Sequence, residues 1–216
     1  MAEFAVARED LVDDLVRGGY VRSATVERAF RAVPRERFVT PDQRRRAYVD
    51  TPLPIPAGQT ISAPSMIAIM LEEADLGPGL RVLDVGTGSG YNAALLAAIV
   101  GPEGVVSIER HPELVTFAKE NLAAAGFGGV TVVEGDGTLG HAPRAPYDRI
   151  VVTAGAPRIA RSWVRQTKLG GRILAPLGRS TFSQVLVIAT KTGADTVAER
   201  KGTPCAFVPL IGREGW

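Results

Sequence analysis

The feature that most constrains the fold is a run of β-branched and apolar residues that ends in closely spaced glycines, Leu80-Arg81-Val82-Leu83-Asp84-Val85-Gly86-Thr87-Gly88-Ser89-Gly90. An apolar, helix-prone stretch follows at once over residues 91–100. A buried strand that turns tightly into a helix presents glycines and free backbone N–H groups to a nucleotide-like ligand. The pattern predicts a cofactor site in a parallel α/β sheet, although such turns also occur purely for packing.

The spacing of the three glycines separates two classes of cofactor. A dinucleotide site has the pattern G-x-G-x-x-G, whereas here the third glycine comes one residue early. After an acidic residue, this G-x-G-x-G form resembles motif I of Rossmann-like methyltransferases that use S-adenosylmethionine. The resemblance implies a doubly wound fold of that class. The residues of this segment that we expect to contact the cofactor are Asp84, Gly86, Thr87, Gly88, Gly90 and Asn92.

Downstream of the glycine loop, strand-like and helix-like segments alternate. Helix candidates cover residues 91–100, 112–125 and 159–167. Such alternation predicts right-handed crossovers and a mostly parallel sheet that is covered on both faces. No clear helix separates the last two strand candidates, which favours an antiparallel edge. The seven strand candidates are residues 81–85, 105–109, 130–133, 149–153, 172–175, 184–189 and 206–210.

The first 76 residues are expected to form helices and an active-site loop. Helical periods cover residues 3–18, then a helix with Ser23 as its N-cap that closes before Pro34, then residues 65–74. Residues 51–64 contain four prolines and a glycine, which exclude a long helix or a central strand. We expect one domain over residues 1–216, in which residues 77–216 supply the cofactor-binding sheet and the C-terminal strands.

Composition excludes several other classes of protein. The net charge is only +2 and the basic run Arg44-Arg45-Arg46 reads as a solvated helix face, so no nucleic-acid partner is expected. Cys205 is the sole cysteine, which rules out an intrachain disulfide or a thiolate zinc cluster, and no metal is expected. The N-terminus lacks a signal-peptide pattern, and no apolar run could cross a bilayer. We expect a cytoplasmic monomer without a membrane partner.

Further strand ends carry side chains suited to a nucleotide-like cofactor. Glu109 lies about 20 residues beyond the glycines, where a carboxylate can accept hydrogen bonds from both ribose hydroxyls. The alternative is that Glu109 forms a surface ion pair with Arg110. In Gly135-Asp136-Gly137, Asp136 can meet an adenine amino group and the neighbouring N–H a ring nitrogen, or the segment can be a plain turn. The small residues of Thr153-Ala154-Gly155-Ala156-Pro157 leave room for a reacting group.

With these motifs in place, the chain closely resembles the protein-L-isoaspartate (D-aspartate) O-methyltransferase family. The most specific match is the loop Gly58-Gln59-Thr60-Ile61-Ser62-Ala63-Pro64, which follows Pro52-Leu53-Pro54-Ile55. One departure is Ser65, where family members often carry His or Tyr, so no contact from such a ring is expected. The other matching segments are Val33-Pro34-Arg35-Glu36-Arg37-Phe38-Val39, Ala145-Pro146-Tyr147-Asp148, Gly170-Gly171-Arg172 and Phe207-Val208-Pro209-Leu210.

The resemblance implies methyl transfer from S-adenosylmethionine, with S-adenosylhomocysteine as product, to the free α-carboxyl of L-isoaspartyl and D-aspartyl residues in damaged proteins and peptides. The methyl ester then starts repair through a succinimide. By the same resemblance, Ser62 is the catalytic hydroxyl. The cofactor contacts it implies are Thr60, Ile61, Glu109, Arg110, Asp136 and Gly137, and the substrate contacts are Ile55, Ser62, Val208 and Pro209.

The chemistry fits residues of this kind and leaves some alternatives open. An Asp-like carboxyl titrates near 4, so the nucleophile is already ionised and no strong base is required. His111 and His141, the two histidines, are expected to be structural or solvent-facing. Ser62 could instead stabilise its own loop through local backbone bonds. A methyltransferase acting on a different carboxyl, or a domain that binds the cofactor without turnover, also remains possible from sequence.

Overall fold

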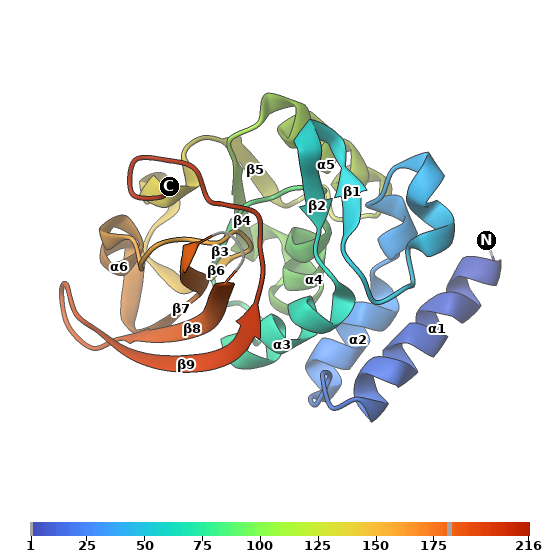
Figure 1. Ribbon diagram of the computed structural model, residues 1–216, viewed down its shortest axis with the longest axis horizontal. Helices are drawn as coiled ribbons and strands as arrows, with labels where there is room; N and C mark the ends of the chain where they lie inside the picture. The colour runs from blue at the N-terminus through green and yellow to red at the C-terminus, as the bar shows by residue number, and fades with distance from the viewer. Residues whose placement is uncertain (1, 181–182) are drawn as a thin grey trace.

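A seven-stranded sheet forms the centre of the computed structural model, which describes residues 2–180 and 183–216 (Figure 1). Five neighbouring strands pair in parallel, and β8 runs antiparallel to both of its neighbours. The prediction of a mostly parallel sheet with an antiparallel edge is confirmed. In spatial order the strands are β5 (Thr131–Glu134), β4 (Val105–Glu109), β3 (Val82–Val85), β6 (Tyr147–Val152), β7 (Thr167–Ser180), β8 (Ser183–Lys191) and β9 (Val197–Cys205).

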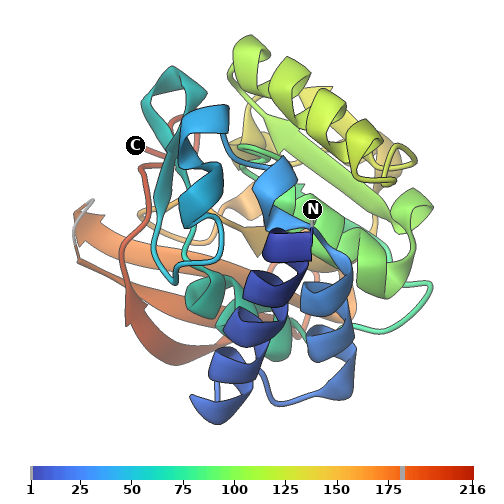
Figure 2. The same ribbon diagram turned by 90° about the vertical axis from the view of Figure 1, so that its right-hand side faces the viewer.

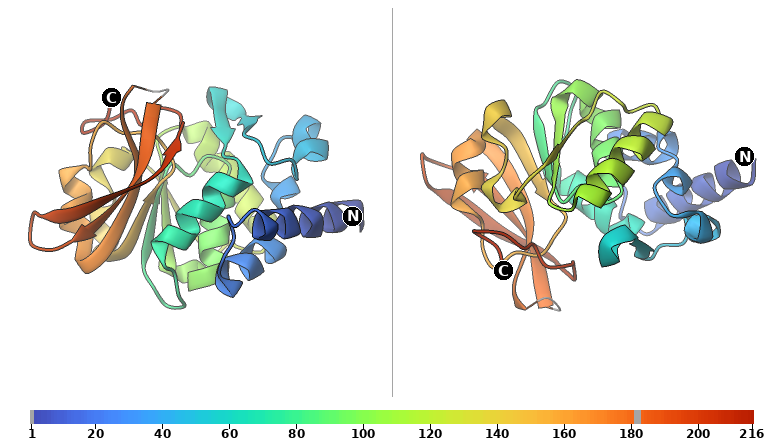
Figure 3. Two further views of the ribbon diagram at one scale, coloured as in Figure 1. Left: turned by 60° about the horizontal axis from the view of Figure 1, so that its bottom comes forward. Right: turned by 90° about the horizontal axis from the view of Figure 1, so that it is seen from above.

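Helices cover both faces of the sheet, as Figure 3 shows from two sides. Because successive side chains of a strand point to opposite faces, Val82 of β3 packs in one hydrophobic core while the adjacent Leu83 packs in the other. The first core also contains residues of α1 to α5, and the second contains Trp163 of α6. The helices are α1 (Ala2–Arg17), α2 (Ala24–Ala32), α3 (Pro64–Ala74), α4 (Tyr91–Val100), α5 (Pro112–Ala124) and α6 (Arg161–Gln166).

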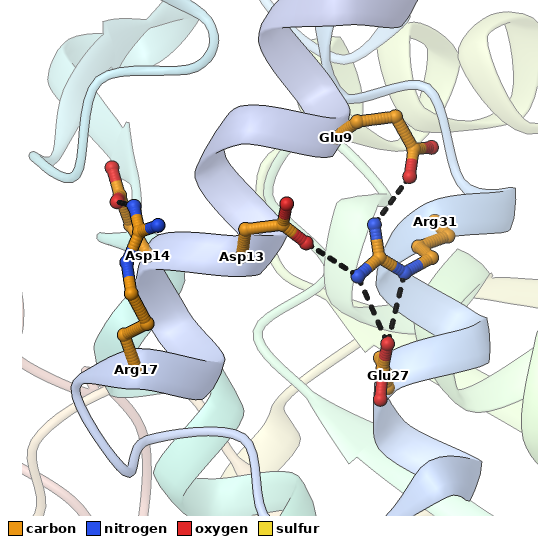
Figure 4. Close-up of polar contacts among 6 residues, drawn as sticks. All are labelled: Glu9, Asp13, Asp14, Arg17, Glu27 and Arg31. Atoms are coloured by element: carbon orange, nitrogen blue, oxygen red, sulfur yellow. Dashed lines mark hydrogen bonds and ion pairs between the residues drawn. The ribbon is translucent and has the colours of Figure 1, made fainter.

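The N-terminal helices α1 and α2 lie side by side (Figure 2). The predicted N-cap is confirmed, because the Ser23 hydroxyl accepts a hydrogen bond from the Val26 N–H. Arg31 of α2 forms ion pairs with Glu9 and Asp13 of α1 and with Glu27 one turn earlier in its own helix (Figure 4). These contacts join the two helices at their exposed faces. Among the described residues, no helix is both long and apolar enough to span a membrane.

The proline-rich stretch forms a small antiparallel hairpin of β1 (Leu53–Ile55) and β2 (Gln59–Ile61). Its turn is the 3₁₀ segment η3 (Pro56–Gly58), where Ala57 and Gly58 both adopt left-handed φ values, 57° and 65°. Two more 3₁₀ segments, η1 (Arg35–Arg37) and η2 (Pro41–Arg46), connect α2 to this hairpin. The absence of a long helix or a central strand here follows the prediction from the prolines.

The predicted last strand at residues 206–210 is wrong, because the seventh strand is β9, residues 197–205. Nearly all of β9 is exposed and it carries charged residues, so it lacks the apolar alternation by which strands are recognised. Residues 207–210 instead run across the end of the sheet (red in Figure 1). There Pro209 forms an isolated bridge with Gly155, and the N–H of Leu210 donates to the Gly155 carbonyl at 2.7 Å.

Candidate active site

A cavity opens at the carboxyl ends of β3, β4 and β6, and it encloses about 920 Å³ including its open mouth. The chain leaves β3 for β4 on one side and β6 lies on the other, so this is where the strand order reverses, the usual ligand position in such sheets. Twelve of the predicted site residues line it: Thr60, Ile61, Ser62, Gly86, Thr87, Gly88, Asn92, Glu109, Arg110, Gly137, Val208 and Pro209. Four others, Ile55, Asp84, Gly90 and Asp136, do not.

The glycine loop forms a cradle that side chains would fill. Gly86 has a φ of 94°, and a Cβ on it would lie 3.0 Å from the Thr153 hydroxyl oxygen. That hydroxyl donates to the Gly86 carbonyl at 2.8 Å and so holds the loop against the end of β6. Gly90 has a φ of 90° and forms the N-cap of α4. A ligand can therefore approach the backbone here, as the sequence predicted.

Asp84 supports this loop from inside the protein. Its carboxylate is fully buried and accepts hydrogen bonds from Asn92 Nδ2 at 2.8 Å and Ser107 Oγ at 2.7 Å. Burial raises the pKa of Asp84 to about 6, against these two hydrogen bonds, which lower it. Asn92 lines the cavity, and its buried Oδ1 has no hydrogen-bond partner in the described part of the chain. Asp84 thus fixes the orientation of the Asn92 amide, whose Oδ1 can accept a hydrogen bond from a ligand in the cavity.

Glu109 links the end of β4 to the glycine loop. Its Oε2 accepts the Gly88 N–H at 3.0 Å, while its Oε1 accepts the N–H groups of Arg110 and His111 at 2.8 and 3.0 Å. The alternative of an ion pair with the Arg110 side chain is not observed among the residues described, since every bond comes from the backbone. The carboxylate lines the cavity at the position predicted for a ribose contact.

Asp136 is turned away from the cavity, whereas Gly137 lines it. The Asp136 carboxylate accepts hydrogen bonds from the Thr138 N–H and hydroxyl and from the Arg213 N–H at 2.9 Å. Burial raises the pKa of Asp136, but these hydrogen bonds outweigh it and hold the pKa below its usual range. Gly137 is buried, and a Cβ on it would lie 2.7 Å from a Val85 side-chain carbon, so a larger residue would not fit here. Of the two residues predicted to contact adenine, Gly137 lines the cavity and Asp136 does not.

The same cavity is lined by Thr60 and Ile61 of β2 with the following Ser62, and by Val208 and Pro209. A second cavity shares Thr60, Ser62, Thr153 and Val208 with the first. It adds the apolar side chains of Met66 and Phe207, and Cys205, whose thiol pKa is raised to about 11 by burial. Ile55 lies behind the glycine loop, with its Cδ1 3.4 Å from where a Cβ on Gly88 would be. Ser62 therefore lies where the two cavities meet.

Several lining residues were not predicted from the sequence: Ser89, Tyr91, His111, Leu114 and Ile211. Tyr91 begins α4 and His111 is the N-cap residue of α5, so both follow a strand end that was recognised. A signal was therefore available, because the first turn after each parallel strand faces the ligand position. His111, which was expected to be structural or solvent-facing rather than catalytic, lies in the cavity wall and is partly exposed.

The fold and the cavity together define a Rossmann-like methyltransferase that uses S-adenosylmethionine. The glycine cradle, the strand-end carboxylate and the unpartnered Asn92 acceptor are the groups that fit this cofactor. The family model of the protein-L-isoaspartate(D-aspartate) O-methyltransferases matches residues 6–215. The chain belongs to this family, and it is accordingly an O-methyltransferase.

Relatives and solved structures agree with this assignment. A protein-L-isoaspartate O-methyltransferase of Pyrococcus horikoshii is 53% identical over 95% of this chain and 93% of its own length. That of Hyperthermus butylicus is 50% identical over 99% of this chain and 92% of its own. A Plasmodium falciparum structure in complex with S-adenosyl-L-homocysteine superposes with a TM-score of 0.84 at 26% identity, over 94% of this chain and 98% of that chain.

Proposed function

We propose that this chain transfers a methyl group from S-adenosylmethionine to the free α-carboxyl of L-isoaspartyl and D-aspartyl residues in damaged proteins and peptides. The observation that carries the proposal is the place of Ser62, at the junction between the cofactor cavity and a second, partly apolar cavity. A substrate carboxyl at this junction would face the methyl donor, while a flanking residue of the substrate would occupy the second cavity.

The residues of the two walls have different tasks in this reaction. When bound, S-adenosylmethionine supplies an electrophilic methyl group on a sulfonium. The glycine cradle and Glu109 would hold the donor, and the Ser62 hydroxyl would donate a hydrogen bond to one carboxylate oxygen and leave the other to accept the methyl group. Orientation of this kind can supply several kcal/mol, and no general base is required because the carboxyl is already ionised.

The product explains how methylation leads to repair. An isoaspartyl methyl ester has methanol as its leaving group, and the next backbone amide nitrogen attacks the ester carbonyl. The new N–C bond closes a succinimide as the C–O bond breaks; the amide nitrogen gives its proton to solvent, and the departing methoxide takes one up to leave as methanol. Ring opening by water then returns part of the chain to normal aspartate.

The substrate wall favours recognition of backbone rather than of one side-chain sequence. Residues 207–210 run along both cavities: Val208, Pro209 and Leu210 line the first, and Phe207 and Val208 line the second. An extended peptide can lie along such a segment and the hairpin loop opposite. We also propose that the enzyme acts as a monomer in the cytoplasm, which size-exclusion chromatography with light scattering and cell fractionation would test.

A pair of matched peptides tests the proposed function. The protein is incubated with methyl-labelled S-adenosylmethionine and two peptides that differ only in an isoaspartyl or an aspartyl residue at one position. Label is expected in base-labile form on the isoaspartyl peptide alone. Equal labelling of both peptides, or of neither, contradicts the proposal.

A further inference from the structure

Arg35, the first residue of η1, is a fully buried cation. No hydrogen bond or ion pair joins it to an acidic side chain within the described ranges, and its Nε has no hydrogen-bond partner there. Burial lowers the pKa of the guanidinium, against the nearby Tyr91 and Asp50 side chains, which raise it, and the group remains protonated at any physiological pH. A buried charge is costly unless its surroundings compensate it, so its contacts should indicate why it is placed here.

Those contacts are backbone carbonyls from two separate segments. Arg35 Nη1 donates to the carbonyls of Ala47 and, at 3.5 Å, Val49, and Nη2 donates to Thr51 at 3.2 Å. Nη2 also donates to the carbonyl of Ser62 at 3.0 Å. The guanidinium therefore joins residues 47–51, which have no regular structure after η2, to the residue that carries the proposed catalytic hydroxyl.

Two further contacts extend this arrangement into the cavity wall. The guanidinium lies over the ring of Tyr91, 5.7 Å from its centroid, and Tyr91 is the first residue of the helix that follows the glycine loop. Asp50, within the same segment as the carbonyls, accepts the Ser65 N–H at 2.9 Å. The Ser62 loop is thus fixed at two points: Arg35 binds the Ser62 carbonyl, and Asp50 binds the N–H of Ser65. Local hairpin bonds alone do not provide this link to α4.

We propose that Arg35 is a positioning residue for methyl transfer, which acts through the backbone of Ser62 to fix its hydroxyl relative to the methyl donor. Five donors in a rigid planar fork can bind several carbonyls at once, which a lysine ammonium or an uncharged side chain cannot reproduce. The inference rests on the proposed role of Ser62, and it predicts a defect in turnover rather than in cofactor binding.

The first experiment compares Arg35→Met and Arg35→Lys with Arg37→Met as the matched control. Arg37 lies in the same 3₁₀ segment and also donates to a carbonyl, that of Ala124, but it is exposed and away from the cavities. Because small misplacements can cost about 100-fold in rate, we expect kcat to fall about 100-fold in Arg35→Met and less in Arg35→Lys. The Kd for S-adenosylhomocysteine should remain within about threefold of wild type, and Arg37→Met should retain its kcat.

A double-mutant cycle with Ser62→Ala separates positioning from a general effect on folding. If Arg35 acts through the Ser62 hydroxyl, adding Arg35→Lys to Ser62→Ala should lower kcat less than about threefold further. Additive losses, or an equal loss of cofactor affinity, would overturn the inference while leaving the role of Ser62 intact. If Ser62→Ala itself leaves kcat unchanged, the proposed role of Ser62 fails instead. Arg35→Lys decides the matter should Arg35→Met not fold, since far-UV circular dichroism identifies that case.

Discussion

The two halves of the site each rest on one fully buried ionisable side chain, Asp84 beneath the cofactor loop and Arg35 beneath the Ser62 loop, but the two are compensated differently. Asp84 belongs to a regular strand and takes its hydrogen bonds from two side chains, Asn92 and Ser107. Arg35 belongs to a short 3₁₀ segment and bonds only to backbone carbonyls. The half that binds the methyl donor, here called the donor half, is therefore formed by the regular sheet. The half that includes Ser62, here called the acceptor half, consists of irregular segments that the Arg35 side chain joins. Cofactor affinity and turnover should consequently respond to different substitutions.

The largest effect is expected from Gly86→Val, which attacks the donor half at its backbone. The new side chain would combine an unfavourable φ of 94° with a Cβ only 3.0 Å from the Thr153 hydroxyl. We expect cofactor affinity to fall at least about 1,000-fold, roughly 4 kcal/mol, by calorimetry. Gly101→Val is the control, because Gly101 has a φ of 95° but no atom within 4 Å of its Cβ position. If Gly86→Val binds the cofactor as tightly as wild type, the glycine loop does not form the cofactor-binding half of the site.

Asp84→Asn tests the buried charge of the donor half through pH. Since burial raises the folded-state pKa of Asp84 to about 6, its stabilising contribution is full below pH 4 and is lost as the pH rises to about 6. The unfolding free energy of wild type relative to Asp84→Asn should therefore decline by about 3 kcal/mol between pH 4 and 7 in urea titrations. Asp148→Asn should show the opposite slope, and at lower pH: burial raises the pKa of Asp148, but the Lys168 ammonium and backbone hydrogen bonds outweigh this and lower it, so its stabilising contribution is full above about pH 4 and is lost as the pH falls below that value. Parallel pH profiles for the two variants would contradict this account.

Ser62→Ala separates the two halves most directly. Loss of the hydroxyl should lower kcat about 100-fold while the Kd for the cofactor stays close to wild type, because the hydroxyl orients the acceptor only. Steady-state kinetics with an isoaspartyl peptide measures the first quantity and calorimetry the second. Ser65→Ala, three residues away, is the control and should retain wild-type turnover. A collapse of cofactor binding in Ser62→Ala would show that the halves are not separable.

Glu109→Ala should give the reverse result of Ser62→Ala. Removal of the carboxylate leaves the Gly88 N–H without its acceptor and deletes the proposed ribose contact. Cofactor binding should weaken by roughly 1.5–3 kcal/mol, with kcat at saturating cofactor little changed. Glu134 pairs with Glu109 in the neighbouring strand but is exposed, so Glu134→Ala provides the control. Equal affinities of the two variants would argue against the ribose role.

The smallest effect is expected at the surface, where charge is not buried. Arg31→Met should lower the unfolding free energy by about 1 kcal/mol, because Arg31 joins α1 to α2 through three carboxylates. Arg17→Met, which removes a single exposed pair with Asp14 (Figure 4), should change it by less than about 0.5 kcal/mol. Denaturant unfolding in low and high salt checks both values. Equal losses would show that the Arg31 cluster is not a network.

The sequence predicted the donor half far better than the acceptor half, for a physical reason. The helix at residues 91–100 and the strand at 105–109 have the bounds predicted, because glycines and uninterrupted apolar runs mark them locally. The contact between Arg35 and Ser62 spans 27 residues and uses carbonyls, which every residue possesses. No residue pattern announces such a bond. Ser62 itself was found through the family resemblance of its loop.

The exposed strand β9 affects how this protein interacts with other polypeptide chains. A free sheet edge invites a strand from another chain, and Glu199, Lys201 and Pro204 on this one discourage that pairing by charge and by a missing N–H donor. The same residues also lack the apolar alternation of a strand, which is why β9 was not predicted from the sequence. The substrates of this family are themselves polypeptides, so an edge that does not pair with other chains keeps the enzyme from binding them outside its active site.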